Sequence, residues 1–348
     1  MTDRIAPADT ALQHGRAPRP LPLFLSLVRE VAKGNPDIAR RALDGLSRYG
    51  REPRPPALPR RPVVATAGIA TLRDHGGAGQ PLVLVPSLIN PTDVLDLPGR
   101  SLAAVLATHH RVLMVDWGAA RNRSGLDLGE HVEQLLVPLL RSLGEPVDLV
   151  GYCLGGTMAI AAANLVPVRR IATLAAPWRF DAYPASALTG LGRLWREAVP
   201  AAKQLGLLPV EVLQAAFWSL DPHGMVAKFA GLADEPPGSA SAQRFVSLED
   251  WANDGEPIPF PAARELIERL FEANESGIGQ WHVGGRTIAA DPAPALHFTA
   301  TGDRIVPAAS APPGATRAVH SGHVGMVIGS RAAAELHLPL LAFLGPNG

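Results

Sequence analysis

The spacing of apolar residues changes several times along the chain. Between residues 23 and 49, apolar positions recur at helical intervals in two short segments, which Gly34-Asn35-Pro36 separates. The tract at residues 51–62 is rich in proline and arginine and predicts a linker. From residue 62 onward, short apolar runs of strand length alternate with helical stretches. Arg111–Trp117, with the sequence R-V-L-M-V-D-W, is typical of the buried strands predicted in this part.

The alternation stops at Trp178, and it resumes near residue 286. The residues in between contain helical pieces, tryptophans and breaks rich in proline and glycine. Strands that alternate with helices imply a mostly parallel sheet covered on both faces. We therefore predict a basic N-terminal helical arm and linker at residues 1–61. An α/β core follows in two pieces, at residues 62–177 and 286–348, and an inserted helical cap lies between these pieces at residues 178–285.

The stretch Val147–Ala162 combines an apolar strand, a sharp turn and an alanine-rich helix. Cys153, the only cysteine of the chain, stands at the turn between Gly151 and Gly155. A nucleophile at such a turn has strained backbone geometry and projects above the sheet, so its neighbours two residues away must be nearly free of side chains. The N-terminus of the following helix favours the thiolate. We interpret Cys153 as a nucleophile; the alternative is a buried, inert cysteine in a glycine-bounded turn.

Such a nucleophile needs a base within hydrogen-bond reach and an acid that orients the base. Asp303 follows the apolar strand Ala295–Ala300, and His323 follows the next strand in a glycine-flanked loop. The chain order nucleophile, acid, histidine is that of α/β-hydrolase folds. We therefore predict this fold and the catalytic triad Cys153, Asp303 and His323, although Gly302-Asp303 alone would also suit an ordinary turn.

An oxyanion hole requires two backbone N–H donors. Leu154, the residue after the nucleophile, supplies the first. The second is expected in the loop after the strand Leu82–Val85, where Leu88 and Ile89 are the candidates, and we select Ile89. Asp116-Trp117-Gly118 also ends a strand, and it either lines the pocket or is a simple strand terminus.

Composition narrows the remaining functions. Lysine plus arginine equal aspartate plus glutamate at 32 each, so the charge gives no reason to expect nucleic acid. Residues 1–61, however, hold twelve Lys and Arg against six Asp and Glu. The single cysteine excludes an internal disulfide and is compatible with a reducing cytosol. The apolar run Leu21–Val28 is too short for a membrane span, so we expect a cytoplasmic protein.

Cofactor motifs are not apparent. The glycines of Gly151–Thr157 are not followed by the Lys-Ser/Thr pair of a phosphate-binding loop. We see no metal-ligand cluster either, so we expect neither a metal nor a bound cofactor.

The motif G-Y-C-L-G-G around Cys153 resembles the cysteine version of the lipase box in polyhydroxyalkanoate synthases. The resemblance covers about residues 62–345 and is closest to the short catalytic subunits of the two-component synthases. Further segments agree in order along the chain: V-P-S-L-I-N-P-T-D-V-L-D-L at 85–97, V-D-W-G at 115–118, L-A-A-P-W-R-F-D at 174–181, F-V-S-L-E-D-W at 245–251, H-V-G-G-R-T at 282–287, T-G-D-R-I-V-P at 301–307 and S-G-H-V-G at 321–325.

The resemblance implies a function. Cys153, Asp303 and His323 would be catalytic, and the substrate would be an (R)-3-hydroxyacyl-CoA, polymerised with release of CoA through an acyl group on the cysteine. The CoA thioester is then a substrate and not a cofactor. The family usually works as a homodimer; its short form needs an accessory subunit, and association with the polymer granule is expected.

Two other functions remain open at this point. The first keeps the fold and the triad but uses water as the acceptor, which gives a Cys-dependent esterase or thioesterase. The second is a non-catalytic homologue that binds granules or a partner through the basic arm. A complete Cys–Asp–His set argues against the second, because a binding module has no need of it.

Overall fold

The computed structural model describes residues 17–54, 60–97 and 99–345. The chain forms two compact units, and each is built from two separate segments of the sequence. Among the described residues, the smaller unit comprises 17–54 and 222–250, and the larger unit comprises 60–97, 99–221 and 251–345.

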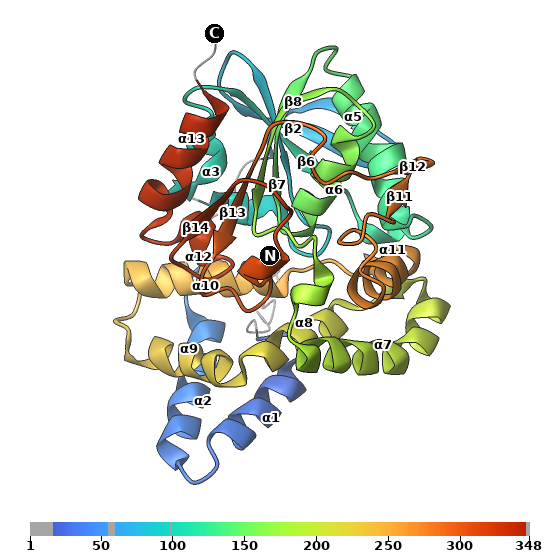
Figure 1. Ribbon diagram of the computed structural model, residues 1–348. Helices are drawn as coiled ribbons and strands as arrows, with labels where there is room; N and C mark the ends of the chain where they lie inside the picture. Colours follow the sequence, from blue (N-terminus) through green and yellow to red (C-terminus); the bar gives the residue numbers. More distant parts are fainter. Residues whose placement is uncertain (1–16, 55–59, 98, 346–348) are drawn as a thin grey trace, which may run out of the picture. The chain divides into compact units, whose positions relative to one another are not determined.

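An eight-stranded sheet forms the centre of the larger unit (Figure 1). The two strands at one edge are antiparallel to their neighbours, and all the other pairs are parallel. The predicted mostly parallel sheet is therefore confirmed. In spatial order the strands are β1 (Val63–Ala67), β2 (Ala70–Gly76), β6 (Arg111–Asp116), β3 (Pro81–Val85), β7 (Val147–Tyr152), β8 (Val168–Leu174), β13 (Ala295–Ala300) and β14 (Thr316–Val319).

Helices cover both faces of this sheet, which explains why its central strands are continuously buried. Every residue of β3 and β7 is buried. In Figure 1, α5 (Val137–Arg141) and α6 (Leu154–Ala163) lie on one face, and α3 (Leu102–Leu106) and α13 (Leu338–Leu344) lie on the other.

The helical segment that follows β6 begins with a capping box, in which the Asp127 side chain accepts from the Glu130 N–H. It contains α4 (Leu128–Glu130), a π-helical stretch at His131–Leu136 and then α5. Pro138 cannot donate a backbone hydrogen bond, and the wider turns directly precede it. The helix is therefore irregular in the turns before this proline.

The predicted cap contributes several helices to the larger unit. Trp195 of α7 stacks on Phe260 of α11 with ring centroids 5.9 Å apart, and its indole N–H donates to Glu268. The helices and short strands that complete this unit are α7 (Ala185–Leu205), α8 (Val210–Leu220), α11 (Phe260–Arg264), a π-helix at Glu265–Glu272, α12 (Gly325–Ile328), β4 (Asp96–Leu97), β5 (Arg100–Ser101), β9 (Leu207–Leu208), β10 (Ile258–Pro259), β11 (His282–Val283) and β12 (Arg286–Thr287).

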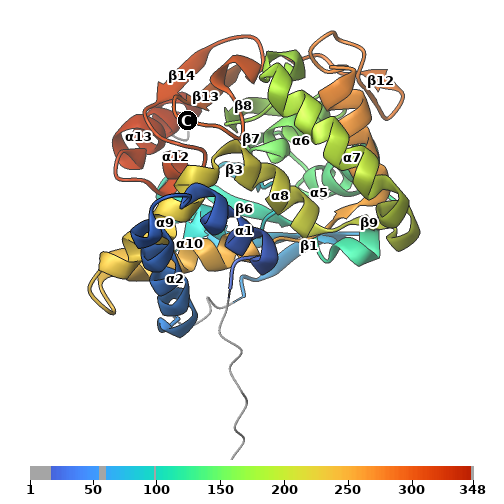
Figure 2. The same cartoon turned by 90° about the horizontal axis from the view of Figure 1, so that it is seen from below.

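The smaller unit joins the N-terminal arm to the middle of the predicted cap (Figure 2). Its helices are α1 (Leu21–Val31), α2 (Pro36–Arg51), α9 (Pro222–Asp234) and the first part of α10 (Ala240–Asn253). Phe229 lies 4.7 Å from Phe24 and 5.2 Å from Phe245 between ring centroids. A Cβ on Gly45 would lie only 1.8 Å from the Phe229 carbonyl oxygen, so this contact requires a glycine.

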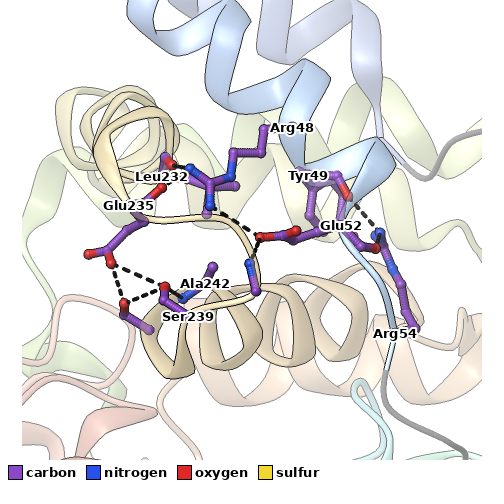
Figure 3. Close-up of polar contacts among 10 residues, drawn as sticks. Arg48, Tyr49, Glu52, Arg54, Leu232, Glu235, Ser239 and Ala242 are labelled. Carbon is purple, nitrogen blue, oxygen red and sulfur yellow. Dashed lines mark hydrogen bonds and ion pairs between the residues drawn. The ribbon is translucent and has the colours of Figure 1, made fainter.

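Polar contacts reinforce the same packing (Figure 3). Arg48 donates to the Leu232 carbonyl at 2.9 Å. Glu52, only 7% exposed, accepts from the Gly238 N–H at 3.1 Å and from Arg48 at 3.2 Å. The end of α2 is thereby fixed to the loop between α9 and α10.

The two units differ from the predicted domain boundaries. The sequence assigned residues 222–250 to a single cap at 178–285, whereas they form one unit with the arm predicted at 1–61. The apolar faces of the arm helices identify a buried side, but the helical period does not reveal which distant segment covers it. Residues 55–59 of the predicted linker, and the start of the arm, lie outside the described residues.

Candidate active site

Cys153 occupies a sharp turn between β7 and α6. Its backbone has φ 54° and ψ −132°, a strained conformation for a residue with a side chain. The turn is held by hydrogen bonds from the Cys153 N–H to the Leu174 carbonyl, at 2.9 Å, and from the Gly156 N–H to the Cys153 carbonyl, at 2.8 Å. Cys153 is partly exposed, which allows it to meet a substrate.

The glycines beside Cys153 are required by close packing. A Cβ on Gly151 would lie 2.3 Å from the Gly156 Cα, and a Cβ on Gly155 would lie 2.1 Å from the Val85 carbonyl oxygen. Because these neighbours are backbone atoms, they cannot move aside as a flexible side chain can. The strand, the turn and the helix therefore pack at a distance that only glycine allows.

Asp303 and His323 lie in the loops after β13 and β14, and they form a close pair. His323 Nδ1 is 2.6 Å from Asp303 Oδ2. The other carboxylate oxygen accepts from the N–H groups of Ile305 and Val306 at 2.8 and 2.9 Å. The Asp303 side chain is fully buried, and that of His323 is 9% exposed. The acid is thus fixed by backbone donors and can orient the imidazole.

The imidazole of His323 lies close enough to Cys153 for the two side chains to interact electrostatically. Burial alone lowers the pKa of His323, but the charges of Cys153 and Asp303 and the hydrogen bond to Asp303 raise it to about 10. The structure therefore places Cys153, His323 and Asp303 close to one another; that they act as nucleophile, base and orienting acid stays a prediction.

Of the predicted oxyanion donors, Leu154 directly follows the turn, and Ile89 lies in the loop after β3. Leu154 is the first residue of α6, so its N–H has no partner within the helix. The loop after β3 is held by Trp117, whose indole N–H donates to the Pro86 carbonyl at 3.0 Å. In this loop the Ile89 N–H, which we selected, donates to Ser87 Oγ at 3.3 Å. A donor already engaged is less suited to an oxyanion, and this favours Leu88.

Two tyrosines near the triad were not predicted from the sequence. The Tyr152 hydroxyl donates to the His323 carbonyl at 3.3 Å, and the two rings are 5.1 Å apart. Tyr183 hydrogen-bonds Ser310. Burial raises the pKa of both phenols well above the usual value, and the charges of Cys153 and Asp303 add to this. Tyr152 could have been predicted, because it directly precedes the proposed nucleophile in the sequence. Nothing in the sequence around Tyr183 indicates that it lies near the triad.

Within the described residues, the side chains of His, Cys, Asp and Glu form no group that could hold a metal ion. No helix in the same part of the chain combines the length and apolarity that a bilayer crossing requires.

Curated relatives of the chain share a common description. The chain is 27% identical over 289 residues to the poly(3-hydroxyalkanoate) polymerase subunit PhaC of Haloferax mediterranei, an alignment that covers 74% of this chain and 56% of that protein. It is 27% identical over 284 residues to the protein of the same name from a Synechocystis strain, with 74% and 75% coverage. The chain thus spans little more than half the length of the haloarchaeal relative.

Structural neighbours and a family match agree with the sheet topology. Epoxide hydrolase A from Mycobacterium thermoresistibile superposes with a TM-score of 0.52 at 20% identity, covering 82% of this chain and 98% of the other. That likeness concerns the fold alone. Residues 75–336 match the family described as Alpha/beta hydrolase family. With the strand order and the turn at Cys153, this match establishes that the chain belongs to the alpha/beta hydrolase family.

Proposed function

We propose that this protein is an acyltransferase that polymerises (R)-3-hydroxyacyl groups from CoA thioesters into polyhydroxyalkanoate, through an acyl group on Cys153. The observation that carries the proposal is a cysteine, rather than a serine, at the strained turn and in contact with the His323–Asp303 pair. The names of the curated relatives support the same reaction.

The first half-reaction acylates the cysteine. The Cys153 thiolate attacks the thioester carbonyl, and the N–H groups of Leu154 and Leu88 stabilise the oxyanion. When the tetrahedral intermediate collapses, the bond to the CoA sulfur breaks, and His323 donates the proton that makes CoA a free thiol. One thioester replaces another, so the acyl-enzyme keeps the reactivity of the substrate.

The second half-reaction transfers the acyl group to an alcohol. His323 accepts the proton of the acceptor hydroxyl, whose oxygen attacks the Cys153 thioester. An ester forms, the carbon–sulfur bond breaks, and the thiolate returns. Asp303 holds the imidazole in place through both steps. Transfer to an alcohol requires that water be kept away from the acyl-enzyme.

The setting of this activity forms part of the proposal. The relatives are named as subunits of a polymerase, and we extend this to the chain as dependence on an accessory subunit. We further propose a homodimer that acts in the cytoplasm at the granule surface, with the CoA thioester as substrate and without a bound cofactor or a nucleic-acid partner.

The proposal is tested by incubating the purified protein with (R)-3-hydroxybutyryl-CoA and separating polymer, free acid and unreacted substrate. Mass spectrometry of the quenched protein should locate the hydroxybutyryl group on Cys153, and Cys153→Ala should carry none. Esterified chains are expected as the product. Free 3-hydroxybutyrate alone would identify a thioesterase, and CoA release without acylation of Cys153 would contradict the mechanism.

A further inference from the structure

A cavity of about 580 Å³ lies entirely within residues of the larger unit. Its volume is in the range of about 300–1,000 Å³ typical of small-molecule sites. None of the triad residues lines it, but Ser87 and Leu88 of the loop after β3 do. The same loop packs against the nucleophile turn, because a Cβ on Gly155 would lie 2.5 Å from the Pro86 carbonyl oxygen. The cavity therefore adjoins the candidate active site.

A second histidine–aspartate pair forms part of the cavity wall. His75 Nδ1 is 3.0 Å from Asp96 Oδ2, and their side chains are 8% and 10% exposed. Asp96 also accepts from Arg61, at 2.9 Å, and from the Ser101 hydroxyl. Burial alone would raise the pKa of Asp96, but these hydrogen bonds lower it to about 2. The ionised carboxylate therefore fixes the ring of His75.

Because Nδ1 faces Asp96, Nε2 is the nitrogen of His75 left for a ligand in the cavity. In a neutral imidazole Nε2 accepts a hydrogen bond from a hydroxyl group, and in an imidazolium it donates to a carbonyl oxygen. A hydroxy ester carries both groups, so it offers a partner in either protonation state.

The charges around the cavity argue against a phosphate ligand. Two of its arginines are paired with carboxylates, Arg61 with Asp96 at 2.9 Å and Arg73 with Asp116 at 2.7 Å. Burial and three neighbouring carboxylates raise the pKa of Asp93, as expected in a negative field. In all, four arginines face five acids: Arg60, Arg61, Arg73 and Arg123 against Asp93, Asp96, Asp116, Asp254 and Glu256. A neutral ligand fits this balance better than the phosphates of CoA.

We propose that this cavity binds the acyl acceptor, a neutral hydroxy ester chain, and that His75 Nε2 hydrogen-bonds it. The inference rests on the proposed function, since an acceptor chain exists only for a transferase. The pantetheine arm of CoA is also neutral, but it leads to phosphates, which the excess of carboxylates around the cavity disfavours. His75 is thus a binding residue for the acceptor, separate from the triad.

The inference is tested by calorimetric titration of Cys153→Ala protein with the methyl ester of a 3-hydroxybutyrate trimer. The variant His75→Asn, made in the Cys153→Ala protein, keeps an amide donor toward Asp96 but removes the group at the Nε2 position. Its trimer binding should therefore weaken about five- to tenfold, as expected for one lost hydrogen bond. His75→Gln, whose amide reaches the Nε2 position, should recover part of this loss. His282→Asn alters an exposed histidine bonded to the Gln280 carbonyl, and it should bind the trimer like the parent.

Equal trimer affinities in the parent and His75→Asn proteins would overturn the inference. Selective weakening of pantetheine binding by His75→Asn would also overturn it, because the cavity would then hold the CoA arm. Failure of the proposed function gives a different result, namely wild-type protein that forms no acyl-Cys153 from (R)-3-hydroxybutyryl-CoA. Near-ultraviolet circular dichroism of each variant verifies that the fold is intact.

Discussion

At the residue scale, the sulfur of Cys153 determines which reactions the triad supports. Attack of a thiolate on a CoA thioester gives another thioester, so the acyl group is not trapped as a more stable ester. Its fate then depends on whether an alcohol or water reaches it first. The His323 imidazolium, held by Asp303 at 2.6 Å, serves both outcomes equally. The acceptor, and not the triad, distinguishes a synthase from a thioesterase.

Replacement of Cys153 by alanine should abolish acyl transfer, with a rate loss of roughly 10⁴-fold or more. The fold should persist, because the smaller side chain removes no packing that the turn needs, and the sequence has no second cysteine to take over. The measurement is CoA release under single-turnover conditions, with Cys153→Ser as the matched variant that retains a weaker nucleophile. Undiminished CoA release by the alanine variant would remove Cys153 from the mechanism.

The raised pKa of His323 predicts how stability depends on pH. The folded protein binds a proton on this residue up to a pKa of about 10, whereas the ordinary value is 6.5. The native state holds more protons between these values, so the contribution is complete below pH 6.5 and is lost as the pH rises through about 10. Urea unfolding should show the wild type losing more stability across this window than His323→Gln. Parallel profiles for the two proteins would refute the assignment.

Other residues of the site show that a position in the sequence does not reveal its partners in space. The close His323–Asp303 pair could be predicted, because each member follows a strand in the chain order of the fold, whereas the catalytic roles of the triad stay a prediction. Tyr183 and the His75–Asp96 pair were missed, since their partners are remote in sequence and depend on strand order. Ile89 was selected as an oxyanion donor, yet a side chain two residues away takes its N–H. Such local competition is visible only in three dimensions.

At the element scale, the strand–turn–helix unit of β7 and α6 follows directly from the sequence pattern. A run of apolar residues, small residues at the turn and an alanine-rich helix are all local signals, and both elements form where they were expected. The close approach of this unit to the neighbouring β3 is the non-local feature. A side chain added at Gly155 would therefore disturb both the turn and its packing on the sheet.

Gly155→Val should therefore destabilise the protein by at least about 3 kcal/mol or prevent folding, because the side chain meets backbone atoms of Val85 and Pro86. The matched control is Gly190→Ala in α7, where no atom lies within 4 Å of the added Cβ. That substitution should stabilise its helix by about 0.5–1 kcal/mol. Thermal unfolding measures both, and a soluble, fully active Gly155→Val protein would show that the turn is misplaced.

At the scale of the whole molecule, the compact units of the structure have other boundaries than the segments predicted from the sequence. The pattern of strands predicts where the sheet pauses and resumes, but a long insertion of helices contains no signal for how it is partitioned. The aromatic cluster of Phe24, Tyr49, Phe229 and Phe245 supplies the missing information. It joins helices nearly two hundred residues apart in one unit, as contacts of high sequence separation commonly do.

This division predicts the pattern of local opening in hydrogen exchange. If the cap at 178–285 were one cooperative piece, α7 and α9 would exchange together. The contact-based units predict instead that α2 and α9 share one opening free energy, different from that of α7. Gly45→Ala should raise exchange in both α2 and α9 at least about tenfold, because its Cβ collides with the Phe229 carbonyl, while β7 should be unaffected. Gly231→Ala in α9, where the added Cβ meets no atom within 4 Å, is the control and should not raise exchange. Faster exchange in α9 without a matching change in α2 would mean that the arm and this part of the cap are separate.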